Sequence, residues 1–229
     1  MNEQVDITAY EEMPPATSMI ESVRSCGYDL NTAIADIIDN SITAEANNIY
    51  VELQWNKGDP YVSILDDGVG MTEAELAKNI MLGSTSPSEK RNKNDLGRFG
   101  LGLKTASFSM ARELNVFSQT DHTELCFRQW DLDKIEETKK WLVFKTFPTW
   151  YEELPDEIKI KNKGTLILWK KCDRFEKYAS SEKTLKQTAV ELIKYLGTIF
   201  YRFLVGKDKI KIFVNNVLVE GWNPIPNNS

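Results

Sequence analysis

Three short motifs, each polar or rich in glycine, follow one another in the first half of the chain. Residues 36–40 read D-x-x-x-N within an apolar segment, residues 66–70 read D-x-G-x-G, and residues 97–102 read G-x-x-G-x-G. Each motif alone has an ordinary structural explanation. Their order and spacing rarely arise together by chance, so this ordered set constrains the fold more than any other feature of the sequence.

The first motif lies in a predicted helix over residues 30–46, where one face repeats at the helical period through Ile34, Ile37, Ile38 and Ser41. Residues four apart share a helix face, so Asp36 and Asn40 lie together on the opposite side, and we expect Asp39 to point elsewhere. A solvated outer face explains this pattern. The alternative is a general base beside an oxygen ligand for Mg²⁺.

The second motif follows a predicted strand over residues 61–66. Two glycines at alternate positions let the backbone turn sharply and approach a ligand closely. The carboxylate of Asp66 or Asp67 is then placed to accept a hydrogen bond from an exocyclic amine such as that of adenine. A plain Asp-Gly turn explains the same residues equally well.

The third motif comes directly before a predicted helix over residues 102–112. Close-approaching backbone N–H groups and the positive end of a helix dipole, about half a unit charge, stabilise phosphates, and Arg98 and Lys104 add full charges. The pattern is neither a P-loop nor a Rossmann fingerprint, because the required spacing and a preceding strand are missing. A tight junction between loop and helix is the structural alternative.

Hydrophobic periodicity predicts further helices over residues 10–28 and 180–204, and one that begins after Thr72 with a capping box to Glu75. Predicted strands cover residues 48–55, 61–66, 113–119, 123–130, 141–147, 164–170 and 209–215, with a turn at Asn215-Asn216. Helices grouped around antiparallel strands indicate an α+β layered sandwich. The polar, basic stretch over residues 82–98 is a loop of the length that often forms a lid.

Composition narrows the class of protein. A chain of 229 residues is long enough for one sizeable core, and its net charge of −6 argues against wholesale attraction to a polyanion. Three scattered cysteines and a single histidine, His122, predict reduced thiols in a cytoplasmic protein and no histidine-based metal centre. No apolar run reaches the roughly 20 residues that cross a bilayer, and no secretory signal is visible, so we expect no membrane partner.

The motifs "DIIDNSITA", "DDGVGM" and "GRFGLGLK", together with "KGTLILW" at residues 163–169, resemble the GHKL superfamily. This superfamily comprises gyrase, the ninety-kilodalton heat-shock chaperone, histidine kinases and MutL, and the resemblance spans about residues 30–170. The lysine in "GLGLKTAS" is most similar to MORC-type and related prokaryotic ATPases. The resemblance implies a Bergerat fold, a two-layer α/β sandwich whose mixed, mostly antiparallel sheet carries helices on one face.

The resemblance also implies a domain organisation and a set of ligand contacts. We expect an N-terminal segment with a helix over residues 1–29, the ATP-binding domain over residues 30–220 and a tail over residues 221–229 that leads to a further domain. Asn40 would hold Mg²⁺ against the phosphates, Asp66 would bind the adenine amine, and Thr165 would support adenine through water. Further nucleotide contacts would come from Ala44, Gly68, Gly70 and Met71 at the base, and from Gly97, Arg98, Phe99, Gly100, Leu101, Gly102 and Lys104 at the phosphates.

Asp36 departs from the superfamily pattern. Hydrolytic members usually carry glutamate there to orient the attacking water, whereas histidine kinases carry asparagine, so a carboxylate favours hydrolysis over phosphotransfer to protein. Aspartate is one methylene shorter, and a misplacement of ~1 Å can cost ~10²-fold in rate, so we expect slow turnover. The rival interpretation is a nucleotide-sensing module with negligible turnover.

The resemblance further implies that ATP and Mg²⁺ binding closes the 82–98 lid and favours an ATP-dependent homodimer. What the cycle would drive stays open in the sequence. MORC-like relatives act on DNA or chromatin, MutL in mismatch repair and the chaperone on proteins, so both a DNA and a protein client are compatible with it.

Overall fold

The computed structural model describes residues 15–25, 27–81, 102–175, 178–206 and 209–223. Within these ranges the strands form one eight-stranded sheet in the order β5-β4-β3-β6-β2-β1-β7-β8. Neighbouring strands are antiparallel except β1 and β7, which are parallel. No helix in the same ranges is long and apolar enough to cross a membrane.

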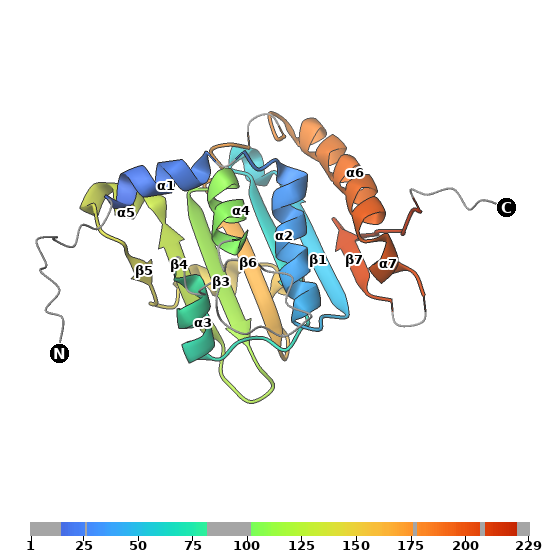
Figure 1. The fold of residues 1–229 in the computed structure, drawn as a ribbon, viewed down its shortest axis with the longest axis horizontal. Coiled ribbons are helices and arrows are strands. Elements are labelled where there is room, and N and C mark those ends of the chain that lie inside the picture. The colour runs from blue at the N-terminus through green and yellow to red at the C-terminus, as the bar shows by residue number, and fades with distance from the viewer. Residues whose placement is uncertain (1–14, 26, 82–101, 176–177, 207–208, 224–229) are drawn as a thin grey trace, which may run out of the picture.

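Helices cover one face of this sheet (Figure 1). The strands are β1 Asn48–Gln54, β2 Tyr61–Asp66, β3 Glu113–Gln119, β4 Cys126–Asp131, β5 Val143–Phe144, β6 Gly164–Lys170, β7 Lys211–Val214 and β8 Val217–Leu218. The helices are α1 Ala16–Arg24, α2 Leu30–Thr43, α3 Glu73–Ile80, α4 Gly102–Met110, α5 Leu132–Thr138, α6 Glu182–Ile199 and α7 Tyr201–Leu204. The expected α+β two-layer sandwich with a mixed, mostly antiparallel sheet is confirmed.

Helix α2 shows why these residues fold as they do. Asp29 caps its first turn by accepting a hydrogen bond from the Thr32 amide at 2.8 Å. Its buried side chains recur every three or four residues, as a helix lying on a sheet requires: Leu30, Ala33, Ile34, Ala35, Ile37, Ile38 and Ser41. The helix ends at Thr43, and Glu45 just beyond it has a positive φ of 59°. The chain then turns directly into β1.

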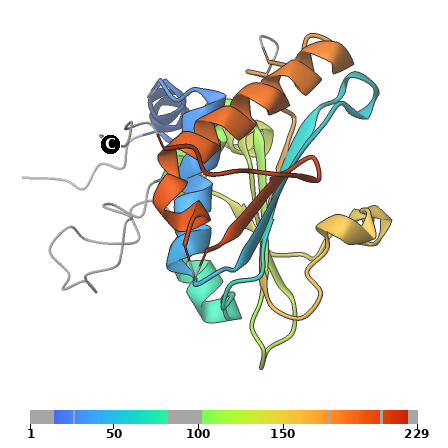
Figure 2. The same ribbon diagram turned by 90° about the vertical axis from the view of Figure 1, so that its right-hand side faces the viewer.

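The second face of the sheet is partly covered as well (Figure 2). Two 3-10 turns, Thr149–Glu153 and Asp156–Ile158, lie there above a small cluster of Leu65, Phe117, Phe127, Tyr151 and Leu166. The predicted strand over residues 141–147 is therefore wrong in length, since only Val143–Phe144 pairs with β4. Each 3-10 turn begins after a proline, Pro148 or Pro155, which cannot donate to a sheet ladder.

One helical prediction also needs correction, and one helix was not predicted. The long helix expected over residues 180–204 is broken at Phe200 into α6 and α7. Helix α5 was not predicted; it starts directly at the end of β4, where Asp131 accepts hydrogen bonds from the Asp133 and Lys134 amides. The expected turn at Asn215-Asn216 is confirmed, with positive φ at both residues between β7 and β8.

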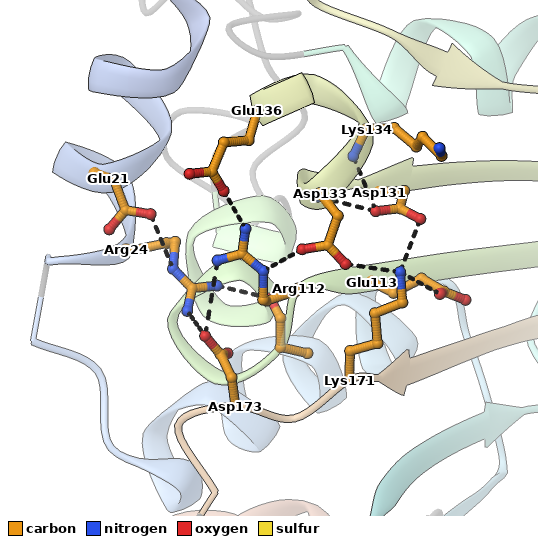
Figure 3. Close-up of polar contacts among 11 residues, drawn as sticks. Glu21, Arg24, Arg112, Glu113, Asp131, Asp133, Lys134, Glu136, Lys171 and Asp173 are labelled. Atoms are coloured by element: carbon orange, nitrogen blue, oxygen red, sulfur yellow. Dashed lines mark hydrogen bonds and ion pairs between the residues drawn. The ribbon is translucent and has the colours of Figure 1, made fainter. Parts of the chain in front are cut away.

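Helix α1 is tied to the rest of the layer by a charged network (Figure 3). Arg24 is only 2% exposed; it donates to the Ala111 carbonyl at 3.1 Å and to Asp173 at 2.6 Å. Arg112 meanwhile donates to Asp133 and Glu136 of α5. The network lies beyond the C-terminal end of α4, whereas Gly102 of the third motif is the first residue of that helix. Its charges therefore anchor α1 at the opposite end of α4 from Gly102.

Candidate functional site

Three central strands place three polar side chains in one row of the sheet. Asp66 at the end of β2 pairs with Thr165 on β6, and Thr165 pairs with Ser118 on β3. The Ser118 and Thr165 hydroxyl oxygens are 2.9 Å apart, and Ser118 also donates to the Gly164 carbonyl at 3.0 Å. Residues 66, 118 and 165, far apart in the chain, thus form a single polar row across three strands of the sheet.

The Asp66 carboxylate lies at one end of this row and is 6% exposed. It accepts hydrogen bonds from the Ser41 hydroxyl at 2.8 Å, the Gly68 amide at 3.0 Å and the Thr165 amide at 3.2 Å. Burial raises the pKa of Asp66; the three hydrogen bonds counteract the rise, and the charge of Asp67 adds to it. A buried carboxylate with a raised pKa in a row of hydroxyls is typical of a binding site.

The neighbouring Asp67 has a different role. Its carboxylate accepts from the Asn47 amide at 2.7 Å, the Asn48 amide at 2.9 Å and the Asn48 side chain at 2.6 Å. These contacts fasten the turn between α2 and β1. The second motif by itself left both aspartates open and the resemblance pointed to Asp66; only Asp66 belongs to the polar row.

The two glycines of the second motif are required by packing. A Cβ at Gly68 would lie 2.7 Å from the Ala44 carbonyl oxygen, and one at Gly70 would lie 1.9 Å from the Gln119 carbonyl oxygen. Gly70 also has a positive φ of 69°. The adjacent Met71 amide donates to Ser118 at 2.9 Å. Ala44, Gly68, Gly70 and Met71 therefore lie around the polar row, and their role in a base pocket stays a prediction.

The first motif forms the other end of the site, on the solvent side of α2. Asn40 is exposed and Asp36 is half-buried. The Tyr28 hydroxyl donates to Asp36 Oδ2 at 2.6 Å, and the same oxygen lies 3.7 Å from the Cβ position of Gly102 at the start of α4. Helices α2 and α4 pack side by side (Figure 1), so folding brings Asp36 of the first motif beside Gly102, the described residue of the third.

Asp39 senses the charge of Asp36, although the helical spacing predicted that its side chain points elsewhere. Burial raises the pKa of Asp39, and the negative charge of Asp36 raises it further. Asp39 is thus close enough to Asp36 to sense its charge, although Asp36 alone contacts Tyr28.

Lys104 is turned away from solvent. Its side chain is 1% exposed, and its ammonium donates to the backbone carbonyls of Asn79 at 2.7 Å and Met81 at 2.9 Å. Burial lowers the pKa of Lys104 to about 8. These carbonyls end helix α3, where a positive charge complements the helix dipole. A contact between Lys104 and a phosphate, as expected from the sequence, would require the ammonium to leave them.

The remaining residues of the third motif, Gly97, Arg98, Phe99, Gly100 and Leu101, lie outside the described residues, as does the expected lid over residues 82–98. Gly102 is the part of the motif that the structure places, at the first position of α4.

Sequence reasoning missed three site residues. Ser41 carried a local signal, because a hydroxyl on the buried stripe of a helix needs a hydrogen-bond partner. Ser118 and Tyr28 carried none, since their roles depend on the pairing of β3 with β6 and on the path of the chain into α2.

The donor set suits a nucleotide with Mg²⁺. Within the described ranges, no group of three or more His, Cys, Asp or Glu side chains is arranged to hold a metal ion alone. Mg²⁺ bound with a nucleotide needs no such cage, because phosphates and waters fill most of its coordination shell and one or two protein oxygens complete it. Asn40 is exposed on the face of α2 that also carries Asp36 and supplies an oxygen of this kind.

Comparison with known proteins gives the same picture. The family described as "Histidine kinase-, DNA gyrase B-, and HSP90-like ATPase" matches residues 28–165, which include both ends of the site. ATPase morc-1 of Caenorhabditis elegans is 29% identical over 90 residues, which are 39% of this chain and 10% of that protein.

Two further relatives show the same partial coverage. ATPase MORC2 of Homo sapiens is 30% identical over 97 residues, 41% of this chain and 9% of that protein. Chaperone protein HtpG of Oceanobacillus iheyensis is 26% identical over 100 residues, 40% of this chain and 16% of that protein. The chain thus matches only a small part of the length of these relatives.

Proposed function

The chain belongs to the family of histidine kinase-, DNA gyrase B- and HSP90-like ATPases, and we propose that it binds ATP with Mg²⁺ and hydrolyses it slowly to ADP and phosphate. The observation that carries the proposal is the buried Asp66 carboxylate at the end of the Ser118–Thr165 row. A carboxylate held by three donors keeps a fixed orientation and an accepting lone pair for one more hydrogen bond.

At the base end, Asp66 accepts a hydrogen bond from the exocyclic amine of adenine. The hydroxyl of Thr165 supports the ring through water, and Ala44, Gly68, Gly70 and Met71 surround it. This contact would distinguish adenine from bases that carry a carbonyl at the same position. Such a carbonyl would face the Asp66 carboxylate, and two acceptors left unpaired cost more than the loss of one hydrogen bond.

At the phosphate end, Asn40 holds the metal and Asp36 orients the attacking water. The bound Mg²⁺ supplies neutralisation of the phosphate charge that develops as the terminal phosphoryl group leaves. Asp36 accepts a hydrogen bond from the water and so directs a lone pair of the water oxygen at phosphorus. Its stem is one methylene shorter than that of glutamate, which is the reason we propose slow turnover.

Binding is tested by calorimetry with ATP and Mg²⁺ on the wild type, Asp66→Asn and Asp67→Asn. We expect Asp66→Asn to keep the fold. The amide oxygen still accepts from Gly68 and Thr165, and its NH₂ group donates to the Ser41 hydroxyl oxygen. The Ser41 proton then points to the Ile37 carbonyl, 3.4 Å away. We expect about 10- to 100-fold weaker ATP binding in Asp66→Asn, and no loss in Asp67→Asn. Equal affinities in Asp66→Asn and the wild type would refute the assignment of the base end.

Turnover is tested by steady-state phosphate release from the wild type, Asp36→Ala and Asp36→Glu. We expect release above the Asp36→Ala background in the wild type and in Asp36→Glu. The second candidate is a nucleotide-sensing module, which an aspartate in place of the longer glutamate favours. ATP binding without phosphate release above the Asp36→Ala background would support it.

Closure of residues 82–98 over the nucleotide and ATP-dependent pairing of two copies are proposals that rest on the family alone. Sedimentation of the chain with and without a non-hydrolysable ATP analogue tests the pairing. A sedimentation coefficient that does not rise with the analogue at saturating concentration argues against it. The client on which the cycle acts, DNA or protein, stays open.

A further inference from the structure

Tyr28 joins the start of α2 to the carboxylate that the proposed reaction needs. It precedes the helix cap Asp29, yet its hydroxyl reaches Asp36, about two turns into the helix. The donor and acceptor oxygens are 2.6 Å apart. This distance lies in the range of charge-assisted O–H···O⁻ hydrogen bonds, which are about twice as strong as neutral ones.

The position of Tyr28 is set by the way the chain enters α2. Asp29 caps the helix through the Thr32 amide, and the amide of Leu30 donates to the Tyr178 hydroxyl at 3.1 Å. The Tyr28 ring itself packs against the main core. With its backbone and ring both held, the tyrosine presents its hydroxyl at a defined point beside α2.

The Asp36 carboxylate lies between this hydroxyl and α4. Oδ2 accepts from Tyr28 and lies 3.7 Å from the Cβ position of Gly102, an ordinary van der Waals distance, so the start of α4 lies against the same oxygen. Among the described residues, Oδ1 has no hydrogen-bond partner. Tyr28 therefore holds one oxygen of the carboxylate and leaves the other available for a further hydrogen bond.

We propose that Tyr28 is a positioning residue for Asp36: by holding Oδ2, it orients Oδ1 toward the water that attacks ATP. This inference rests on the proposed function. An unrestrained aspartate samples several rotamers, and a reacting group displaced by ~1 Å can lose ~10²-fold in rate. A fixed hydroxyl selects one rotamer and compensates for a side chain that reaches less far than glutamate.

The test is a double-mutant cycle of Tyr28→Phe and Asp36→Ala, with kcat for phosphate release and Kd for ATP measured on all four proteins. Tyr28→Phe keeps the packed ring and removes only the hydroxyl. We expect kcat to fall about tenfold or more, with the ATP Kd changed less than twofold. In the Asp36→Ala background the same change should have no further effect, because the carboxylate that it acts through is gone.

Tyr178→Phe is the matched control, since it removes a hydroxyl from the same helix start without touching Asp36. We expect it to lower the melting temperature while kcat stays at the wild-type value. Unchanged kcat in Tyr28→Phe, or an equal fall of kcat in Tyr178→Phe, overturns the inference. So does an equal fall in both Asp36 backgrounds.

The outcomes separate this inference from the proposed function. A wild type that releases no phosphate above Asp36→Ala refutes the hydrolytic function and the role of Tyr28 with it. A wild type that hydrolyses ATP, but whose Tyr28→Phe variant turns over equally fast, refutes the role of Tyr28 alone.

Discussion

The two ends of the candidate site differ in burial and in the number of hydrogen bonds that hold their side chains. At the base end, the Asp66 carboxylate is 6% exposed and takes donors from α2, from the turn after β2 and from β6. At the phosphate end, Asn40 is exposed, and the one side-chain donor to Asp36 among the described residues is Tyr28.

The two ends therefore depend on different parts of the fold. The base end forms when the sheet forms, because the register of β2, β6 and β3 places its polar groups in one row. The phosphate end depends on one helix, one tyrosine hydroxyl and the packing of α4. We therefore expect changes that break the packing of the base end to destabilise the fold, and changes at the phosphate end to leave folding largely intact.

The largest expected effect is that of Gly70→Ala, which tests the rigidity of the base end. Its Cβ would lie 1.9 Å from the Gln119 carbonyl oxygen in a backbone with positive φ, so we expect a loss of about 3–5 kcal/mol in the free energy of unfolding. Urea denaturation measures it. Gly58→Ala is the control, because Gly58 also has positive φ but nothing within 4 Å of its Cβ position. Equal losses in the two variants would show that the close packing does not matter.

A smaller effect is expected from Lys104→Met, which tests whether the ammonium is held inside the protein. Because burial lowers its pKa to about 8, the unfolded chain holds a proton between pH 8 and pH 10 that the folded chain releases. Wild-type stability relative to Lys104→Met should therefore rise across this window, by about 1–2 kcal/mol.

Urea denaturation at pH 7, 8, 9 and 10 provides the measurement. Lys78→Met is the control, since Lys78 lies exposed on α3 and its loss removes a charge without removing a buried ammonium. Parallel stability curves for the wild type and Lys104→Met would mean that the ammonium is solvated, as phosphate binding by Lys104 would allow.

The smallest expected effect on the fold is that of Asn40→Ala. Since Asn40 is exposed, we expect an unchanged melting temperature, together with a loss of about tenfold in ATP affinity that appears only when Mg²⁺ is present. Calorimetry with Mg²⁺ and with EDTA measures this. Asn31→Ala, on the first turn of the same helix, should bind ATP as the wild type does. A loss of affinity that is the same in EDTA contradicts a metal-binding role.

Much of the fold was predictable from local pattern. The central strands β2, β3 and β6 have the predicted bounds, because strands buried on both faces read as apolar runs between turn residues. The prediction was wrong where tertiary contacts override local preference. The stretch expected as a strand up to residue 147 leaves the sheet early, so that Tyr151 can pack on Phe117 with ring centroids 4.6 Å apart.

The family and the fold class could be read from the sequence alone, because glycines and carboxylates at fixed spacings reflect local backbone geometry, and the site residues that it named stay predictions. The second motif alone could not separate Asp66 from Asp67, although the family resemblance pointed to Asp66, and nothing in the sequence revealed Ser118 and Tyr28 or showed that Lys104 faces the end of α3. Those facts were decided by strand register and helix packing, which bring together groups far apart in the chain. Hydrogen bonds act only over about 3 Å, so no local pattern contains them.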